Sequence, residues 1–229
     1  MKRLKYAIVC SALFLLIGAS FTVAAETITD LTGDVWHWTY TGTAGSWAGN
    51  VGGKPNIDIT QLSATVNGND LTLSLTVAGT IQYSAKEWYW AYYNTTDTTY
   101  SMWWYNGTGV GIASKQGGGV PEFVQNLTVS GNTISAVFKV LGDTSKVELW
   151  GWAAEYTTIG ATQTTNEWWG DWAPNSKIPF STTPTGNNTG ENNGNNTDGN
   201  NSGTKTPGFE VLPLIAAVAI AAVLLRRRR

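Results

Sequence analysis

Few residues in this chain could perform catalysis. The single histidine, His37, lies between two tryptophans, and the single cysteine, Cys10, lies in an apolar N-terminal stretch. A multi-histidine or Cys/His metal site therefore cannot form. No nucleophile-elbow motif accompanies His37, so the sequence does not indicate a Ser-His-Asp triad.

Carboxylates are the remaining catalytic candidates, because paired acids can hydrolyse glycosidic bonds. Five acids are candidates for such a pair: Glu87, Glu148, Glu155, Glu167 and Asp171. Acids on a solvated surface explain them more simply, so we expect no enzyme. Residues 26–180 contain thirteen acids and six lysines, a net charge of −7, and this acidic balance excludes nucleic acid as an expected partner.

Tryptophan is the most unusual component. All twelve tryptophans fall between Trp36 and Trp172. Residues two apart in a strand share a face, which predicts one aromatic-lined sheet face from the groups Trp36/Trp38, Trp88/Trp90/Tyr92 and Trp150/Trp152. Two interpretations remain open: the rings fill a core between two sheets, or some form an exposed platform on which sugar rings stack.

The Gly- and Thr-rich stretch between Tyr156 and Pro174 is predicted to be a loop, and loops on a rigid scaffold often carry binding residues. It contains three tryptophans and two acids. We predict a ligand site that would bind a polysaccharide or glycan, made of Glu167, Trp168, Trp169, Asp171 and Trp172, assisted by Trp103, Trp104 and Tyr105.

The segments that would position these residues show apolar and polar side chains alternating with a period of two residues. Leu71, Leu73, Leu75 and Val77 alternate with Thr and Ser, as in a half-buried strand. Hairpin turns are predicted at 67–70 and 130–132, where Gly and Asn tolerate positive φ. The expected strands are 36–40, 57–66, 71–77, 86–93, 100–105, 109–114, 123–129, 133–140 and 147–156. The predicted fold is all-β, an antiparallel β-sandwich.

The two ends of the chain predict export. Lys2, Arg3 and Lys5 precede an apolar stretch, and Val23-Ala24-Ala25 is typical of a signal-peptidase site, so residues 1–25 are predicted to be a signal peptide. Residues 26–180 would form the outer domain. Residues 181–206, rich in Asn, Gly and Thr, would form a disordered glycosylated linker. Possible N-glycosylation sites are Asn94, Asn106, Asn126, Asn187, Asn195 and Asn200.

Residues 211–225 are apolar and precede Arg226–Arg229, which predicts a transmembrane helix with a cytoplasmic end. Fifteen residues cover only about 22 Å of a roughly 30 Å hydrocarbon core. Together with Pro207-Gly208-Phe209, this tail (207–229) resembles the PGF-CTERM sorting signal of archaeal surface proteins. The resemblance implies processing by an archaeosortase, attachment to a membrane lipid, and location at the cell surface, in or near an S-layer.

A second resemblance concerns the start of the outer domain. Asp30-Leu31-Thr32-Gly33-Asp34, then Pro55-Asn56-Ile57-Asp58-Ile59, is similar to the opening of DOMON-like sandwiches and family 9 carbohydrate-binding modules. It implies a structural calcium ion near Asp30, Asp34 and Asp58, although aspartates also cap turns. Some DOMON-like domains hold haem between Met and His, for which only Met102 and His37 would be available.

These observations predict a surface-anchored, non-enzymatic protein. Carbohydrate binding or adhesion is the first expectation. The alternative is a structural, S-layer-associated protein whose aromatic face or strand edges pack against copies of itself. A glycoside hydrolase or a haem-binding domain is the weaker expectation.

Overall fold

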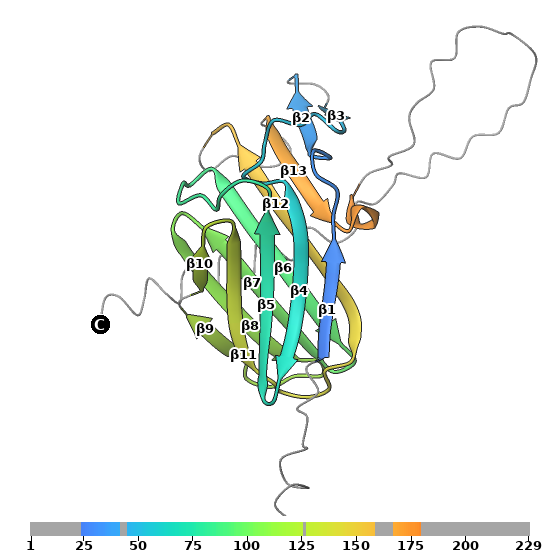
Figure 1. The fold of residues 1–229 in the computed structure, drawn as a ribbon, viewed down its shortest axis with the longest axis vertical. Coiled ribbons are helices and arrows are strands. Elements are labelled where there is room, and N and C mark those ends of the chain that lie inside the picture. Colours follow the sequence, from blue (N-terminus) through green and yellow to red (C-terminus); the bar gives the residue numbers. More distant parts are fainter. Residues whose placement is uncertain (1–23, 42–44, 126, 159–166, 180–229) are drawn as a thin grey trace, which may run out of the picture. The chain divides into compact units, whose positions relative to one another are not determined.

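The computed structural model describes residues 24–41, 45–125, 127–158 and 167–179 (Figure 1). Most of the predicted signal peptide, the linker and the sorting signal lie outside these residues, as do Asn126, Asn187, Asn195 and Asn200. Among the described residues, no helix combines the length and apolar character needed to span a bilayer, and the predicted span 211–225 falls outside them. The described strands belong to one compact unit that ends at Lys177.

The strands form two antiparallel sheets. In spatial order, the small sheet contains β1 (Ala24–Thr29), β4 (Ile59–Asn67), β5 (Asp70–Val77), β11 (Thr133–Lys139) and β10 (Thr128–Ser130). The large sheet contains β3 (Gly45–Ala48), β2 (Trp36–Tyr40), β13 (Trp168–Ala173), β12 (Lys146–Tyr156), β6 (Glu87–Thr95), β7 (Thr98–Tyr105), β8 (Thr108–Lys115) and β9 (Glu122–Gln125). A short 3-10 helix, η1 (Asn175–Lys177), follows β13.

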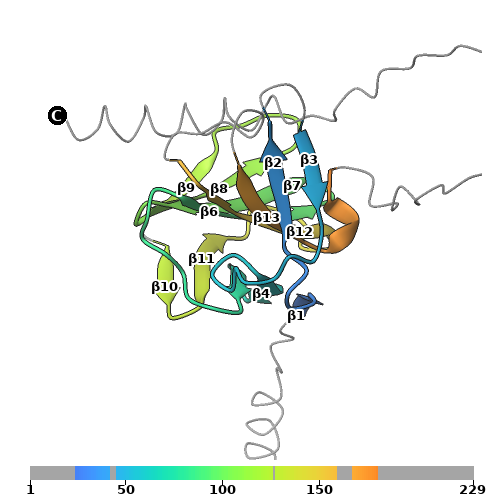
Figure 2. The same cartoon turned by 90° about the horizontal axis from the view of Figure 1, so that it is seen from above.

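The two sheets form the layers of a β-sandwich, as the sequence predicts (Figure 2). From the small sheet, Leu71, Leu73, Leu75 and Val77 of β5 are fully buried. From the large sheet, alternate residues of β6 and β7 meet them: Tyr89, Ala91, Tyr93, Tyr100, Met102 and Trp104. Period-two alternation in both sheets therefore produces one core between them.

Both predicted hairpins are confirmed. Asn67 pairs with Asp70 across the β4–β5 turn, and Ser130 pairs with Thr133 across the β10–β11 turn. Gly68 and Gly131 adopt φ values of 59° and 60° in these turns. A glycine adopts this left-handed conformation without steric cost, so each tight turn sets the register of its two strands.

Three sequence expectations need correction. The strand predicted at 123–129 is two strands, β9 and β10, which belong to different sheets. The loop predicted between Tyr156 and Pro174 contains β13, which pairs with both β12 and β2. Strands β1 and β3 were not predicted, because both are short and lack a clear alternation; β1 begins two residues before the predicted mature N-terminus, Glu26.

Each sheet also has an outer face, directed away from the other sheet. The outer face of the small sheet carries Thr and Ser, including Thr72, Ser74 and Thr76 of β5. The outer face of the large sheet, here called the aromatic face, carries the residues that alternate with the core positions. At one side, the β2–β3 hairpin rises from the large sheet, away from the small sheet (Figure 2).

Candidate functional site

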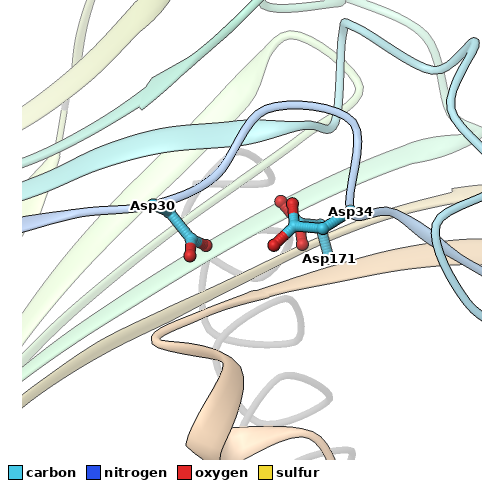
Figure 3. Close-up of side chains that lie close together, drawn as sticks. All are labelled: Asp30, Asp34 and Asp171. Atoms are coloured by element: carbon cyan, nitrogen blue, oxygen red, sulfur yellow. The ribbon is translucent and has the colours of Figure 1, made fainter.

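Aspartates from distant parts of the chain meet at one end of the sandwich. Asp30 and Asp34 lie in the loop after β1, and their side chains lie close to that of Asp171 on β13 (Figure 3). Asp58 directly precedes β4. Asp171 is fully buried, while Asp58 and Asp34 are 4% and 7% exposed. Together with Asn175 of η1, which contacts Asp34, these residues are called the acidic cluster.

Backbone and amide donors satisfy only part of the acidic cluster. Asp171 accepts hydrogen bonds from the Ile59 N–H at 2.6 Å and the Trp172 N–H at 2.9 Å. Asp58 accepts one from the Gly33 N–H at 2.8 Å, and the Asn175 amide donates to Asp34 at 2.7 Å. Gly33 has φ of +85°, a conformation that favours glycine and turns this N–H toward Asp58.

Four buried oxygens of the acidic cluster have no hydrogen-bond partner among the described residues: Asp30 Oδ2, Asp34 Oδ1, Asp58 Oδ1 and Asn175 Oδ1. A buried acceptor without a partner is costly. Burial and the neighbouring carboxylates raise the pKa of Asp171 to about 8. Burial and Asp34 raise the pKa of Asp30 to about 7, and burial raises the pKa of Asp58. The buried carboxylates therefore repel one another and lack, among the described residues, a nearby cation that would neutralise them.

The donor set fits a hard divalent cation. One carboxylate oxygen from each of Asp30, Asp34 and Asp171 lies within 4.8 Å of the others. Two oxygens on opposite sides of Ca²⁺, each about 2.4 Å from it, are about 4.8 Å apart. Calcium accepts six to eight oxygen ligands in flexible geometry, and the cluster offers only oxygens, so calcium suits it better than zinc.

The second feature is the aromatic face. Opposite residues on antiparallel neighbours project to the same side, and the register therefore assigns a side to every tryptophan. Trp103, Trp90, Trp152 and Trp172 form one row across β7, β6, β12 and β13. All tryptophans except Trp104 and Trp169 lie on the aromatic face: Trp36, Trp38, Trp47, Trp88, Trp90, Trp103, Trp150, Trp152, Trp168 and Trp172.

This arrangement differs from the first sequence interpretation, in which the rings fill a core between two sheets. The groups Trp36/Trp38, Trp88/Trp90/Tyr92 and Trp150/Trp152 do share one face, as predicted, but that face is not the core between the sheets. Trp172 is only 2% exposed, whereas Trp88 and Trp150 are half-buried. The aromatic face is a second apolar layer, separate from the core, that remains partly accessible.

Many rings of the aromatic face stack on a ring of the neighbouring strand. Trp88 stacks on Tyr105 with centroids 4.0 Å apart, and Tyr92 stacks on Trp150 at 4.5 Å. These separations are close to the spacing of adjacent strands, about 4.8 Å. Such rings stand upright on the sheet, so their edges, rather than their faces, point outward.

The β2–β3 hairpin holds a ring differently. A Cβ atom added to Gly49 would lie 2.8–2.9 Å from three consecutive atoms of the Trp36 ring, so this ring lies with its face on the glycine. Trp47, on the same hairpin, meets Trp168 edge to face at 4.9 Å and Trp172 at 5.8 Å. The hairpin thereby forms a wall beside the stacked rings.

The predicted ligand residues do not form one site. Trp103, Tyr105, Trp168 and Trp172 lie on the aromatic face. Trp104 and Trp169 point to the other side of the large sheet, and Asp171 belongs to the acidic cluster. The reason is alternation within β13, which separates neighbouring residues that a loop could have brought together.

Trp169 has its own environment. The His37 ring stacks on it at 4.6 Å, and Lys54 Nζ lies 3.7 Å from its centroid. His37 also contacts Glu167 at 2.8 Å, and Lys54 contacts Glu155 at 2.7 Å. These contacts attach β2 and the β3–β4 loop to the end of the large sheet.

The remaining catalytic and haem candidates are placed as follows. Glu148 is paired with Lys177. Glu87 on β6 lies opposite Glu155 on β12, and one buried oxygen of Glu87 has no partner among the described residues. Three strands separate His37 on β2 from Met102 on β7. Four strand spacings amount to about 19 Å, too far for both residues to ligate one iron.

Comparison with known proteins adds no relative: no family model, no curated protein and no solved structure matches this chain. The functional argument therefore depends on the two sites themselves. Sequence reasoning missed Asp171 and Asn175 in the acidic cluster and Trp47 on the aromatic face. The alternation Trp168-Gly170-Trp172 was the available signal that Asp171 points to the other side.

Proposed function

We propose that this protein is a surface-anchored, non-enzymatic binding protein whose aromatic face holds a carbohydrate. One observation carries the proposal: ten of the chain's tryptophans project from the side of the large sheet that the small sheet does not cover. Large apolar surfaces on exported domains mark interaction sites. Sugars combine apolar C–H surfaces with polar hydroxyls, which suits indole and phenol side chains.

The charges on the aromatic face indicate the kind of sugar. Within the strands, its only ionic side chain is Glu148, and that carboxylate is paired with Lys177. An uncharged surface on a domain of net charge −7 offers an acidic polysaccharide no cation to bind. The ligand is therefore a neutral polysaccharide or glycan.

The second candidate function is self-assembly, as in a surface layer. It is supported by the same uncharged face and by the edge strand β9, where Phe123 is 54% exposed beside Val120, which is 93% exposed. Apolar residues at an open sheet edge can pair with another copy. Attachment to the outside of the cell, through a transmembrane tail or a lipid, follows from the predicted sorting signal and serves either function.

In this proposal the acidic cluster binds a calcium ion as the protein's cofactor. Calcium bound by Asp30, Asp34, Asp58, Asp171 and Asn175 neutralises the buried carboxylates. It also supplies a partner to the oxygens of Asp30, Asp34, Asp58 and Asn175 that have none among the described residues. Because Asp58 precedes a strand of the small sheet and Asp171 lies in the large sheet, the ion joins the two layers. Its role is structural.

The binding proposal is tested with the double variant Trp36→Ala/Trp88→Ala, which removes two half-buried rings of the aromatic face. Val137→Ala is the matched control, since Val137 is 53% exposed on the outer face of the small sheet. Affinity electrophoresis in gels containing xylan, mannan or soluble cellulose derivatives measures retention. We expect the double variant to lose at least about tenfold in affinity, equivalent to about 1.4 kcal/mol, and the control to be unchanged.

Acrylamide quenching of tryptophan fluorescence in the unmodified protein provides a test that does not depend on a variant's folding. Protection of the rings by a neutral polysaccharide would support the proposal. Equal retention of the double variant would contradict it. If no polysaccharide protects the rings and sedimentation shows concentration-dependent association, self-assembly is the function. Release of reducing sugar would show an enzyme instead.

A further inference from the structure

The tight turn between β7 and β8 carries an N-glycosylation motif, Asn106-Gly107-Thr108. Asn106 and Gly107 adopt φ values of 49° and 73°, and Tyr105 pairs with Thr108 across them, which is the geometry of a two-residue type I′ turn. Asn106 and Thr108 are both exposed. Asn106 makes no side-chain hydrogen bond to the described residues, so the motif projects from the end of the large sheet.

The other motif among the described residues provides a contrast. Asn94 of Asn94-Thr95-Thr96 lies within β6, paired with Glu148 on β12 and Thr99 on β7. Its side-chain nitrogen donates to Glu148 at 3.1 Å, and its side-chain oxygen is buried. The Thr96 hydroxyl donates to Asp143 at 2.7 Å. Both side chains that a glycosyltransferase must bind are therefore already occupied.

An exposed aromatic ring lies beside the Asn106 turn. A Cβ atom on Gly107 would lie 3.2 Å from Tyr83 Cδ1, so the turn rests against the Tyr83 ring. Tyr83 is 62% exposed and is supported edge to face by Trp104, at 5.3 Å. The Trp104 indole N–H donates to the Gln82 carbonyl at 3.0 Å, which anchors the segment that carries Tyr83. A rigid, exposed ring thus stands beside an accessible asparagine.

We propose that Asn106 is N-glycosylated and that its first sugar packs against the Tyr83 ring, whereas Asn94 is unmodified. The co-reactant is a lipid-phosphate-linked oligosaccharide. The Asn106 Nδ2 attacks C1 of its first sugar, an N–C bond forms, and the C1–O bond to the phosphate breaks. The lipid phosphate leaves with the bonding electrons, and the Nδ2 proton passes to a base of the transferase. This modification does not depend on the proposed carbohydrate-binding function.

Intact-mass and peptide mass spectrometry of the full chain from a host with an N-glycosylation system tests the site. We expect a glycan at Asn106 and none at Asn94. Thr108→Ala should remove the glycan at Asn106, whereas Thr96→Ala, the matched change in the Asn94 motif, should leave it. A glycan at Asn94, or an unmodified Asn106 in a preparation whose other motifs are occupied, would overturn the assignment.

The contact with Tyr83 needs a separate readout. Enzymatic removal of the glycan should lower the melting temperature of the glycosylated protein with Tyr83 intact by about 2 °C, within the range expected for a weak contact in a domain of this size. In Tyr83→Ala the glycan remains attached, and its removal should leave the melting temperature unchanged. An equal shift in both proteins would show that the sugar does not use this ring.

Discussion

The two outer faces of the sandwich are built on the same alternation but with opposite chemistry. On the small sheet, Ser74 bonds Ser135 at 2.8 Å and Thr76 bonds Thr133 at 3.0 Å, hydroxyl to hydroxyl across β5 and β11. On the large sheet, the equivalent cross-strand positions carry stacked rings such as Trp90 and Trp152, with centroids 6.1 Å apart. The outer face of the small sheet is polar and suited to contact with water. The aromatic face of the large sheet buries many of its own side chains and still leaves apolar surface for a partner.

The largest expected effect is on stability and concerns the aromatic face itself. Trp172 is 2% exposed and contacts Trp168, Trp152 and Trp47. Trp172→Ala should lower the free energy of unfolding by about 3–5 kcal/mol, as for a core tryptophan. Urea denaturation measures the loss. A change below about 1 kcal/mol would mean that the rings do not form a packed layer.

Calcium at the junction of the two sheets should have the next largest effect. Calcium at about 100 times its dissociation constant should stabilise the protein by about 2.7 kcal/mol, and chelation should remove this increment. Asp171→Asn should lose most of the response to calcium in thermal unfolding. Asp70→Asn is the control, because Asp70 forms an exposed ion pair with Lys139 and lies opposite Asn67, at the other end of β4 from Asp58. A melting temperature insensitive to chelator would exclude the site.

Calcium should abolish the pH dependence of stability that the acidic cluster causes. The pKa of Asp171 is raised to about 8 and that of Asp30 to about 7 in the metal-free fold, against 3.8 ordinarily. Between about pH 4 and 8, the calcium-free folded protein therefore holds protons that the unfolded chain has released. Its free energy of unfolding should fall as pH rises. With calcium bound, these carboxylates are ionised in both the folded and the unfolded state over that range, so stability should be nearly independent of pH. Denaturation curves at several pH values measure both slopes.

The smallest effect should come from the hydroxyl face. Ser74→Ala removes one hydrogen bond between half-buried hydroxyls and should cost about 0.5–1.5 kcal/mol, well below the loss from Trp172→Ala. The same urea titration measures it. Equal losses from the two variants would remove the distinction between the faces.

Much of the fold could be predicted from local pattern. The alternation of Leu71, Leu73 and Leu75 identified a half-buried strand, and Gly68 and Gly131 marked two hairpins correctly. The prediction failed where pairing with a distant strand decides the structure. β13 is a strand because its backbone bonds β12 and β2, although its Gly- and Trp-rich sequence reads as a loop. Strands β9 and β10 are separate because they join different sheets.

The candidate sites divide in the same way. Spacing alone predicted that Trp88, Trp90 and Tyr92 share a face. It could not say which of two faces the small sheet covers, since that depends on which apolar surfaces meet. The opening aspartates were recognised by resemblance, but Asp171 and Asn175 were not, because they lie more than a hundred residues away and join the cluster only when the chain is folded.

The sequence by itself determined the alternation, the tight turns, the acidic charge and the scarcity of catalytic groups, because these depend on residue type and near neighbours. Only the tertiary structure decided that the tryptophans form a layer outside the core and that buried carboxylates from both sheets converge. Alternation provides each strand with two faces but does not select their partners. That selection is made when two sheets bury their most apolar sides together and bring Asp30, Asp34 and Asp171 close to one another.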